Sequence, residues 1–113
     1  PEFLDGAGPV VESICPGARP VPFGHFGDGN IHYNVTQPVG MARDAYIGMW
    51  HDMSHAVHAL VASMGGSISA EHGIGRLKRD ELPLHKSSVE MGLMRTIKAA
   101  LDPHGILNPG RVV

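Results

Sequence analysis

The chain is poor in several kinds of residue, and each scarcity excludes something. A single cysteine, Cys15, allows no internal disulfide and is typical of a reducing compartment. No apolar run approaches the length of a membrane span, and no signal-type segment is visible, so we expect a cytoplasmic protein. The net charge is −2 and the basic residues form no block, which makes nucleic acid or an anionic membrane a poor candidate partner.

Histidine, by contrast, is abundant: the chain has 8 histidines in 113 residues. This length suffices for one domain with a modest core. The chain begins at Pro1 rather than at a methionine, and we therefore expect it to be a piece of a longer protein. Any activity would then need residues that lie outside this sequence.

The most informative local pattern lies in residues 21–36, where two histidines flank a turn signal. Asp28-Gly29 between apolar residues predicts a β-hairpin with a two-residue turn. This register would place His25 opposite His32, with Cβ atoms about 5 Å apart, and Asn34 on the same face. Such a pair suits a metal ion, although histidines beside a turn can equally be ordinary surface residues. The opposite, core-facing side would hold Phe26, Ile31, Tyr33 and Val35.

The remaining elements follow from periodicity and turn signals. Apolar residues at three- and four-residue spacing predict a helix over 41–64, ended by Gly65-Gly66. A Ser87…Glu90 capping box opens a second helix that ends near residue 101. Residues 67–70 read as a short strand, and the Gly- and Pro-rich residues 1–20 as a lead-in loop. One face of the first helix carries His51, His55 and His58, which we interpret as solvated rather than metal-binding.

A second chemical signal is Glu71-His72, which begins a glycine-punctuated loop after residues 67–70. Two neutral imidazoles and one carboxylate, from His25, His32 and Glu71, would satisfy a divalent ion with a position left open, as in catalytic zinc or non-haem Fe(II) sites. His72 cannot easily share that ion with Glu71. Histidine is a residue type suited to act as a general base near neutral pH, here on a bound substrate.

Three stretches of the chain resemble the signatures of one family. They are Gly24-His25-Phe26-Gly27-Asp28-Gly29-Asn30-Ile31-His32, Ile68-Ser69-Ala70-Glu71-His72-Gly73-Ile74-Gly75 and Leu101-Asp102-Pro103-His104-Gly105-Ile106-Leu107-Asn108-Pro109-Gly110-Arg111. Together they resemble the C-terminal cap domain of FAD-linked oxidases of the vanillyl-alcohol-oxidase superfamily. Members of this family include D-lactate dehydrogenases, the glycolate oxidase flavoprotein subunit and D-2-hydroxyglutarate dehydrogenase.

The resemblance implies a fold and a reaction. The fold is α+β, a ferredoxin-like half domain with an antiparallel sheet and two helices over residues 21–113, and the FAD-binding domain is absent from this chain. The reaction is oxidation of a D-2-hydroxy acid to the 2-oxo acid by FAD. A divalent metal, usually zinc, would be held by His25, His32 and Glu71, with His72 as the base. Asn34 would lie near the substrate, and Asn108 and Arg111 near the flavin.

Other interpretations remain open at this stage. The same two-His-one-carboxylate set would serve a non-haem Fe(II) oxygenase, or a non-enzymatic metal-binding or assembly module. The electron acceptor of a dehydrogenase could be a quinone, a cytochrome or an electron-transfer flavoprotein. We expect the chain alone to be inactive and not to bind FAD, and a half domain with an exposed sheet edge to pair as a homodimer.

Overall fold

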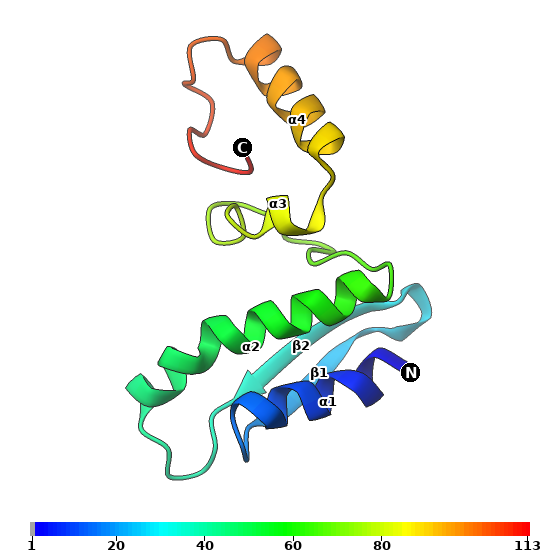
Figure 1. Ribbon diagram of the computed structural model, residues 1–113, viewed down its shortest axis with the longest axis vertical. Helices are drawn as coiled ribbons and strands as arrows, with labels where there is room; N and C mark the ends of the chain where they lie inside the picture. Colours follow the sequence, from blue (N-terminus) through cyan, green and yellow to red (C-terminus); the bar gives the residue numbers. More distant parts are fainter. Residues whose placement is uncertain (1) are drawn as a thin grey trace. The chain divides into compact units, whose positions relative to one another are not determined.

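The computed structural model describes residues 2–113, which form two compact units, one ending at Ala70 and the other spanning Glu71–Val113. A two-stranded antiparallel sheet and four helices confirm the α+β class (Figure 1). Two of these helices, α1 and the short α3, were not predicted. In chain order the elements are α1 (Glu2–Ile14), β1 (Arg19–His25), the 3₁₀ turn η1 (Phe26–Asp28), β2 (Asn30–Thr36), α2 (Arg43–Ser63), α3 (Leu82–His85) and α4 (Ser88–Leu101).

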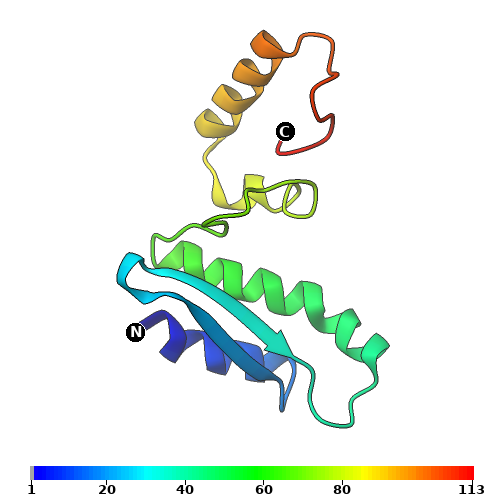
Figure 2. The same ribbon diagram turned by 180° about the vertical axis from the view of Figure 1, so that it is seen from behind.

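In the first unit, α1 and α2 pack against each other and against one face of the β1–β2 hairpin. Figure 1 shows the two helices in front of the strands, and Figure 2 shows the opposite face of the sheet. The helix predicted over 41–64 is confirmed as α2, and Gly65 follows it with a φ of 72°. The core of this unit consists of Val11, Cys15, Ala18 and Met53, against which Tyr33 and Val35 pack as predicted.

The lead-in loop predicted for residues 1–20 is wrong, because Glu2–Ile14 form α1. Interior Pro9 and the nearby glycines weaken the local helix preference. Ala7, Val11 and Cys15 nevertheless recur every four residues and are fully buried. Burial of this stripe against α2 outweighs the unfavourable propensity. The short strand predicted at residues 67–70 is also absent, since Ile68 and Ala70 form bends and the segment lies outside the β1–β2 sheet.

The hairpin forms, but its turn and register differ from the prediction. A four-residue loop, made of η1 and Gly29, replaces the two-residue turn; Gly29 has a φ of 69° and donates its N–H to the Phe26 carbonyl oxygen. His25 therefore pairs with Asn30, and His32 pairs with Phe23. Because Phe26 belongs to the loop rather than to a strand, it is half exposed instead of facing the core.

Two prolines on β1 shape its outer edge. Pro20 pairs with Val35 and Pro22 with Tyr33. Proline has no N–H to donate to a neighbouring strand. Both prolines therefore occupy positions whose backbone polar groups point away from β2. On the other strand, the Tyr46 hydroxyl donates to the Val35 carbonyl oxygen at 2.6 Å, which ties α2 to the sheet. Burial of the Tyr46 ring raises the pKa of its hydroxyl above the ordinary value.

The second unit contains α3, α4 and a C-terminal tail, residues 102–113. The predicted capping box is present: the Glu90 N–H donates to Ser87 Oγ, and the Ser87 N–H donates to a Glu90 carboxylate oxygen. The buried apolar side chains of this unit are Leu82 and Met91. Four apolar side chains on α4 remain mostly exposed: Val89, Leu93, Ile97 and Leu101. Across residues 2–113, no helix combines the length and apolar character needed to cross a bilayer.

Candidate functional site

The uncovered face of the hairpin holds three of the predicted site residues. His25, His32 and Asn34 alternate along the two strands so that all three lie on the side opposite the helices. The corrected register makes His25 and His32 diagonal neighbours rather than an opposed pair. Diagonal side chains across a sheet are about 7–8 Å apart, still within reach of two imidazoles that share a ligand.

His32 is held by an aromatic neighbour that the sequence reasoning missed. The Phe23 and His32 rings stack with centroids 4.9 Å apart and an interplanar angle of 6°. Phe23 itself is 51% exposed, so it offers a flat apolar wall beside the imidazole on an open surface. The misplaced turn concealed this contact, since the predicted register put His25 rather than Phe23 opposite His32.

The predicted metal site takes its ligands from both units of the chain. Within residues 2–113, no group of three or more His, Cys, Asp or Glu side chains is placed to hold a metal ion. His25 and His32 belong to the first unit, whereas Glu71 and His72 are exposed residues of the second. A metal held by His25, His32 and Glu71 therefore stays a prediction from the family resemblance.

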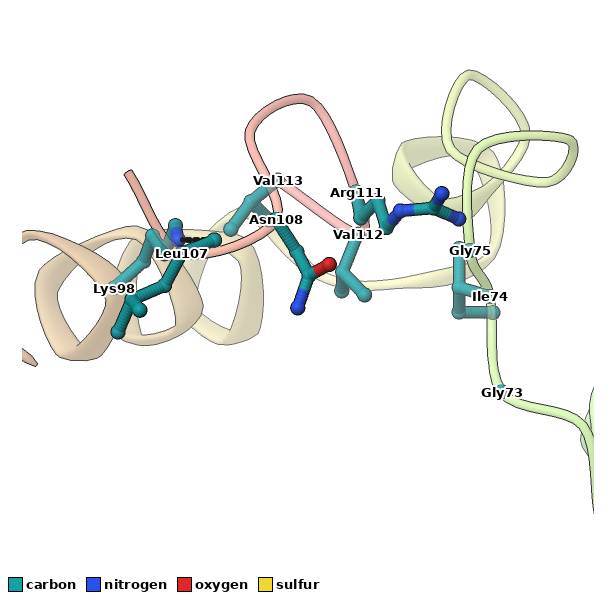
Figure 3. Close-up of a pocket in the computed structure, with 9 residues that line it drawn as sticks. All are labelled: Gly73, Ile74, Gly75, Lys98, Leu107, Asn108, Arg111, Val112 and Val113. Atoms are coloured by element: carbon teal, nitrogen blue, oxygen red, sulfur yellow. Dashed lines mark hydrogen bonds between the residues drawn. The ribbon is translucent and has the colours of Figure 1, made fainter. Parts of the chain in front are cut away.

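In the second unit, the tail folds back onto the loop that follows His72. The Val112 N–H donates to the Gly75 carbonyl oxygen at 3.0 Å. Gly75 and Val112 both line an open, solvent-facing cavity of about 490 Å³ (Figure 3). Two predicted site residues, Asn108 and Arg111, lie on its wall. The remaining lining residues are Gly73, Ile74, Gly75, Lys98, Leu107, Val112 and Val113.

An ion pair between the half-buried Lys98 and the buried Asp102, which we call the Lys98–Asp102 clasp, fixes the start of this tail. Asp102 Oδ1 accepts the N–H of Ile106 at 2.9 Å, and Oδ2 accepts the N–H of Leu107 at 2.9 Å and the Lys98 ammonium at 2.5 Å. The hydrogen bond from Lys98, followed by those from the two backbone amides, lowers the pKa of the Asp102 carboxyl. The sequence signal that could have revealed the clasp is the i, i+4 spacing of Lys98 and Asp102 at the end of α4.

This chain belongs to the family described as FAD linked oxidases, C-terminal domain, whose model matches residues 6–112. The resemblance seen in the three motifs is thereby confirmed, and the match begins inside α1. FAD is the cofactor that this family implies.

Relatives of known name point to one kind of enzyme. The chain is 41% identical over 112 residues to a D-2-hydroxyglutarate dehydrogenase of Stutzerimonas stutzeri, covering 99% of this chain and 24% of the relative. Identity to the enzyme of the same name from Xanthomonas citri is 38%, with the same coverage. The chain is also 38% identical over 117 residues to the mitochondrial D-2-hydroxyglutarate dehydrogenase of Bos taurus. That alignment covers 98% of this chain and 20% of the relative. The chain thus spans about a quarter or less of the length of these relatives.

Proposed function

We propose that this chain contributes to an FAD-dependent enzyme that oxidises D-2-hydroxyglutarate, or a closely related D-2-hydroxy acid, to the 2-oxo acid. The observation that carries the proposal is the family match over residues 6–112, together with D-2-hydroxyglutarate dehydrogenases that align with 99% of the chain. Because the chain spans only a fraction of these relatives, the activity belongs to a longer flavoprotein rather than to these residues alone.

The roles proposed for the chain's residues follow from the chemistry of such an oxidation. Removing two electrons and two protons from a hydroxy acid requires a base for the hydroxyl proton, and His72 is an exposed imidazole suited to that task. Bound FAD supplies the acceptor for the hydrogen on the adjacent carbon. Asn34, on the uncovered sheet face, has an amide that can hydrogen-bond the substrate. Asn108 and Arg111, on the wall of the cavity, are the proposed flavin contacts.

Further properties stay predictions. These are a divalent metal on His25, His32 and Glu71, a homodimer, a cytoplasmic location, and a quinone, cytochrome or electron-transfer flavoprotein as electron acceptor. Metal analysis of the purified protein beside a His25→Ala/His32→Ala variant would test the first. Light scattering over a range of concentrations would test the second, and a compact monomer throughout would contradict it.

The decisive experiment is to express the longest reading frame that contains this sequence and to assay it with D- and L-2-hydroxyglutarate. We expect bound flavin and dye reduction with the D enantiomer only. A His72→Ala variant should retain flavin but lose about 10²–10⁴-fold in kcat, the usual range for removal of a general base.

The matched control is His51→Ala, which removes an exposed histidine from α2. We expect it to leave turnover unchanged. A protein without flavin or without oxidation of the D enantiomer would contradict the proposal. Equal losses in the two histidine variants would remove His72 from its proposed role.

A further inference from the structure

The clasp holds one residue of the tail by both of its backbone polar groups. Asp102 accepts the N–H of Leu107, and the Lys98 ammonium donates to the Leu107 carbonyl oxygen. The Gly105 N–H also donates to the Asp102 carbonyl oxygen at 3.1 Å, which closes the turn after α4. The peptide units on either side of Leu107 are therefore fixed relative to the helix.

This arrangement exceeds what a helix end requires. Helices commonly end with a glycine in the left-handed conformation, which satisfies the last carbonyl groups without any charge. Here a carboxylate that is only 7% exposed occupies the C-cap position. A buried carboxylate is costly unless it is paired and hydrogen-bonded. Its oxygens accept hydrogen bonds from residues of the tail, so the stabilisation is directed at the tail rather than at α4.

The residues just beyond Leu107 are the ones that line the cavity. Asn108 adopts a φ of 49°, a left-handed conformation that is uncommon for residues other than glycine. The Arg111 N–H donates to the Asn108 carbonyl oxygen at 3.3 Å, and Val112 then reaches Gly75. The segment 108–111 is thus held at one end by the clasp and at the other by Gly75. Figure 3 shows the Asn108 amide directed into the space between these two anchors.

We propose that Lys98 and Asp102 are positioning residues, because the clasp fixes Leu107 and thereby sets the direction in which Asn108 and Arg111 face the cavity. The structural part of this inference stands on the contacts of the second unit alone. Its functional part, that the clasp controls how Asn108 and Arg111 meet the flavin, rests on the proposed function.

The structural part can be tested in the chain itself by amide hydrogen exchange. The Val112 N–H donates to Gly75 and not to the clasp, so its exchange reports whether order is transmitted along segment 108–111. In Asp102→Asn and Lys98→Met variants we expect the amides of Leu107 and Val112 to exchange about tenfold or more faster, since hydrogen bonds to charged groups are lost. The Met91 amide in α4 should stay protected.

The matched control is Lys86→Met, which removes an i, i+4 ion pair with Glu90 at the other end of the same helix. It should leave the Leu107 and Val112 amides unchanged. If Asp102→Asn disrupts the unit, Lys98→Met decides the test, because it leaves both backbone bonds to Asp102 in place. Faster exchange at Leu107 with unchanged exchange at Val112 would reduce the clasp to a local cap and overturn the inference.

The functional part is tested in the longer, flavin-containing protein. We expect Asp102→Asn and Lys98→Met to shift the visible flavin absorption band and to lower kcat, with KM for D-2-hydroxyglutarate within about twofold of the original. Lys86→Met should change none of these. A spectrum and kcat identical to the original in both clasp variants would overturn the functional part while the proposed function stands. A protein without flavin would defeat the proposed function, and the exchange experiment would still decide on the clasp.

Discussion

Gly24 lies where the two strands of the hairpin leave no room for a side chain. Its φ is 146°, and a Cβ built at this position would lie 2.4 Å from the Asn30 carbonyl oxygen. That oxygen belongs to the backbone and cannot move without disturbing the ladder. We expect Gly24→Ala to lower the free energy of unfolding by about 1–3 kcal/mol, the usual cost of backbone strain, as measured by urea denaturation.

Gly27 supplies the control for this substitution. It lies in the neighbouring turn, no heavy atom lies within 4 Å of its built Cβ, and its φ is not positive. Gly27→Ala should therefore leave the urea midpoint nearly unchanged. Equal effects of the two substitutions would show that loop entropy, rather than contact with Asn30, governs the response.

At the scale of single residues, contacts between side chains close in sequence were predictable, and contacts that depend on residues distant in sequence were not. Ser87 and Glu90 are three residues apart, and their capping box forms as predicted. The stacking of Phe23 on His32 depends on the hairpin register, and a turn longer by two residues changed that register. The hydrogen bonds that the Ile106 and Leu107 N–H groups donate to Asp102 depend on the path of a tail with no regular structure.

Among the elements, α4 has a start that should be sensitive to acid. Hydrogen bonds from the Ser87 backbone, then from Lys86 and the Ser87 hydroxyl, lower the pKa of Glu90 from 4.5 to about 2. A carboxyl whose pKa is lower in the folded chain stabilises the fold above its unfolded pKa, and this contribution is lost as the pH falls toward 2. The helical circular-dichroism signals of the original and Glu90→Gln chains should therefore differ at pH 6 and converge near pH 2.

Asp28→Asn is a suitable control, because Asp28 lies exposed in the hairpin loop, far along the chain from α4. Its helical circular-dichroism signal should follow that of the original chain from pH 6 to pH 2. A constant difference between the original and Glu90→Gln chains across this range would contradict the pKa argument.

The two long helices of the first unit, α1 and α2, differ in how clearly the sequence predicts them. The stripe of α2 is long and uninterrupted, and its predicted bounds agree with the structure within two residues at the start and one at the end. In α1, the stripe of Phe3, Ala7, Val11 and Ile14 was present in the sequence, but Pro9 and two glycines pointed to a loop. Packing against α2 decided the outcome, and local propensity does not report packing.

At the scale of the whole molecule, the two units differ in how much they bury. The buried cluster Val11, Cys15, Ala18 and Met53 lies entirely within the first unit. We therefore expect residues 1–70 alone to unfold cooperatively on heating, as followed by circular dichroism. Residues 71–113, whose buried apolar residues are Leu82 and Met91, should show a broad, non-cooperative change because so short a chain buries too little surface.

The opposite result, a sharp transition in residues 71–113 and none in residues 1–70, would contradict this assignment of stability.

The division of the chain into two units also explains why the candidate site was only partly predictable from the sequence. His25, His32 and Asn34 share one sheet face and could be grouped from strand alternation. Glu71 and His72 were joined to them by their ligand chemistry and by motif resemblance, since no periodicity in the sequence relates residues of separate units.

The two prolines of β1 have a consequence for how this chain can misassemble. An open sheet grows into a fibril only if each added strand offers a fresh, fully bonding edge on its far side. Pro20 and Pro22 deprive the outer side of β1 of two amide donors, while β2 keeps the N–H groups of Ile31 and Tyr33. Association edge to edge can therefore join two β2 strands about a two-fold axis, and it then stops at a pair.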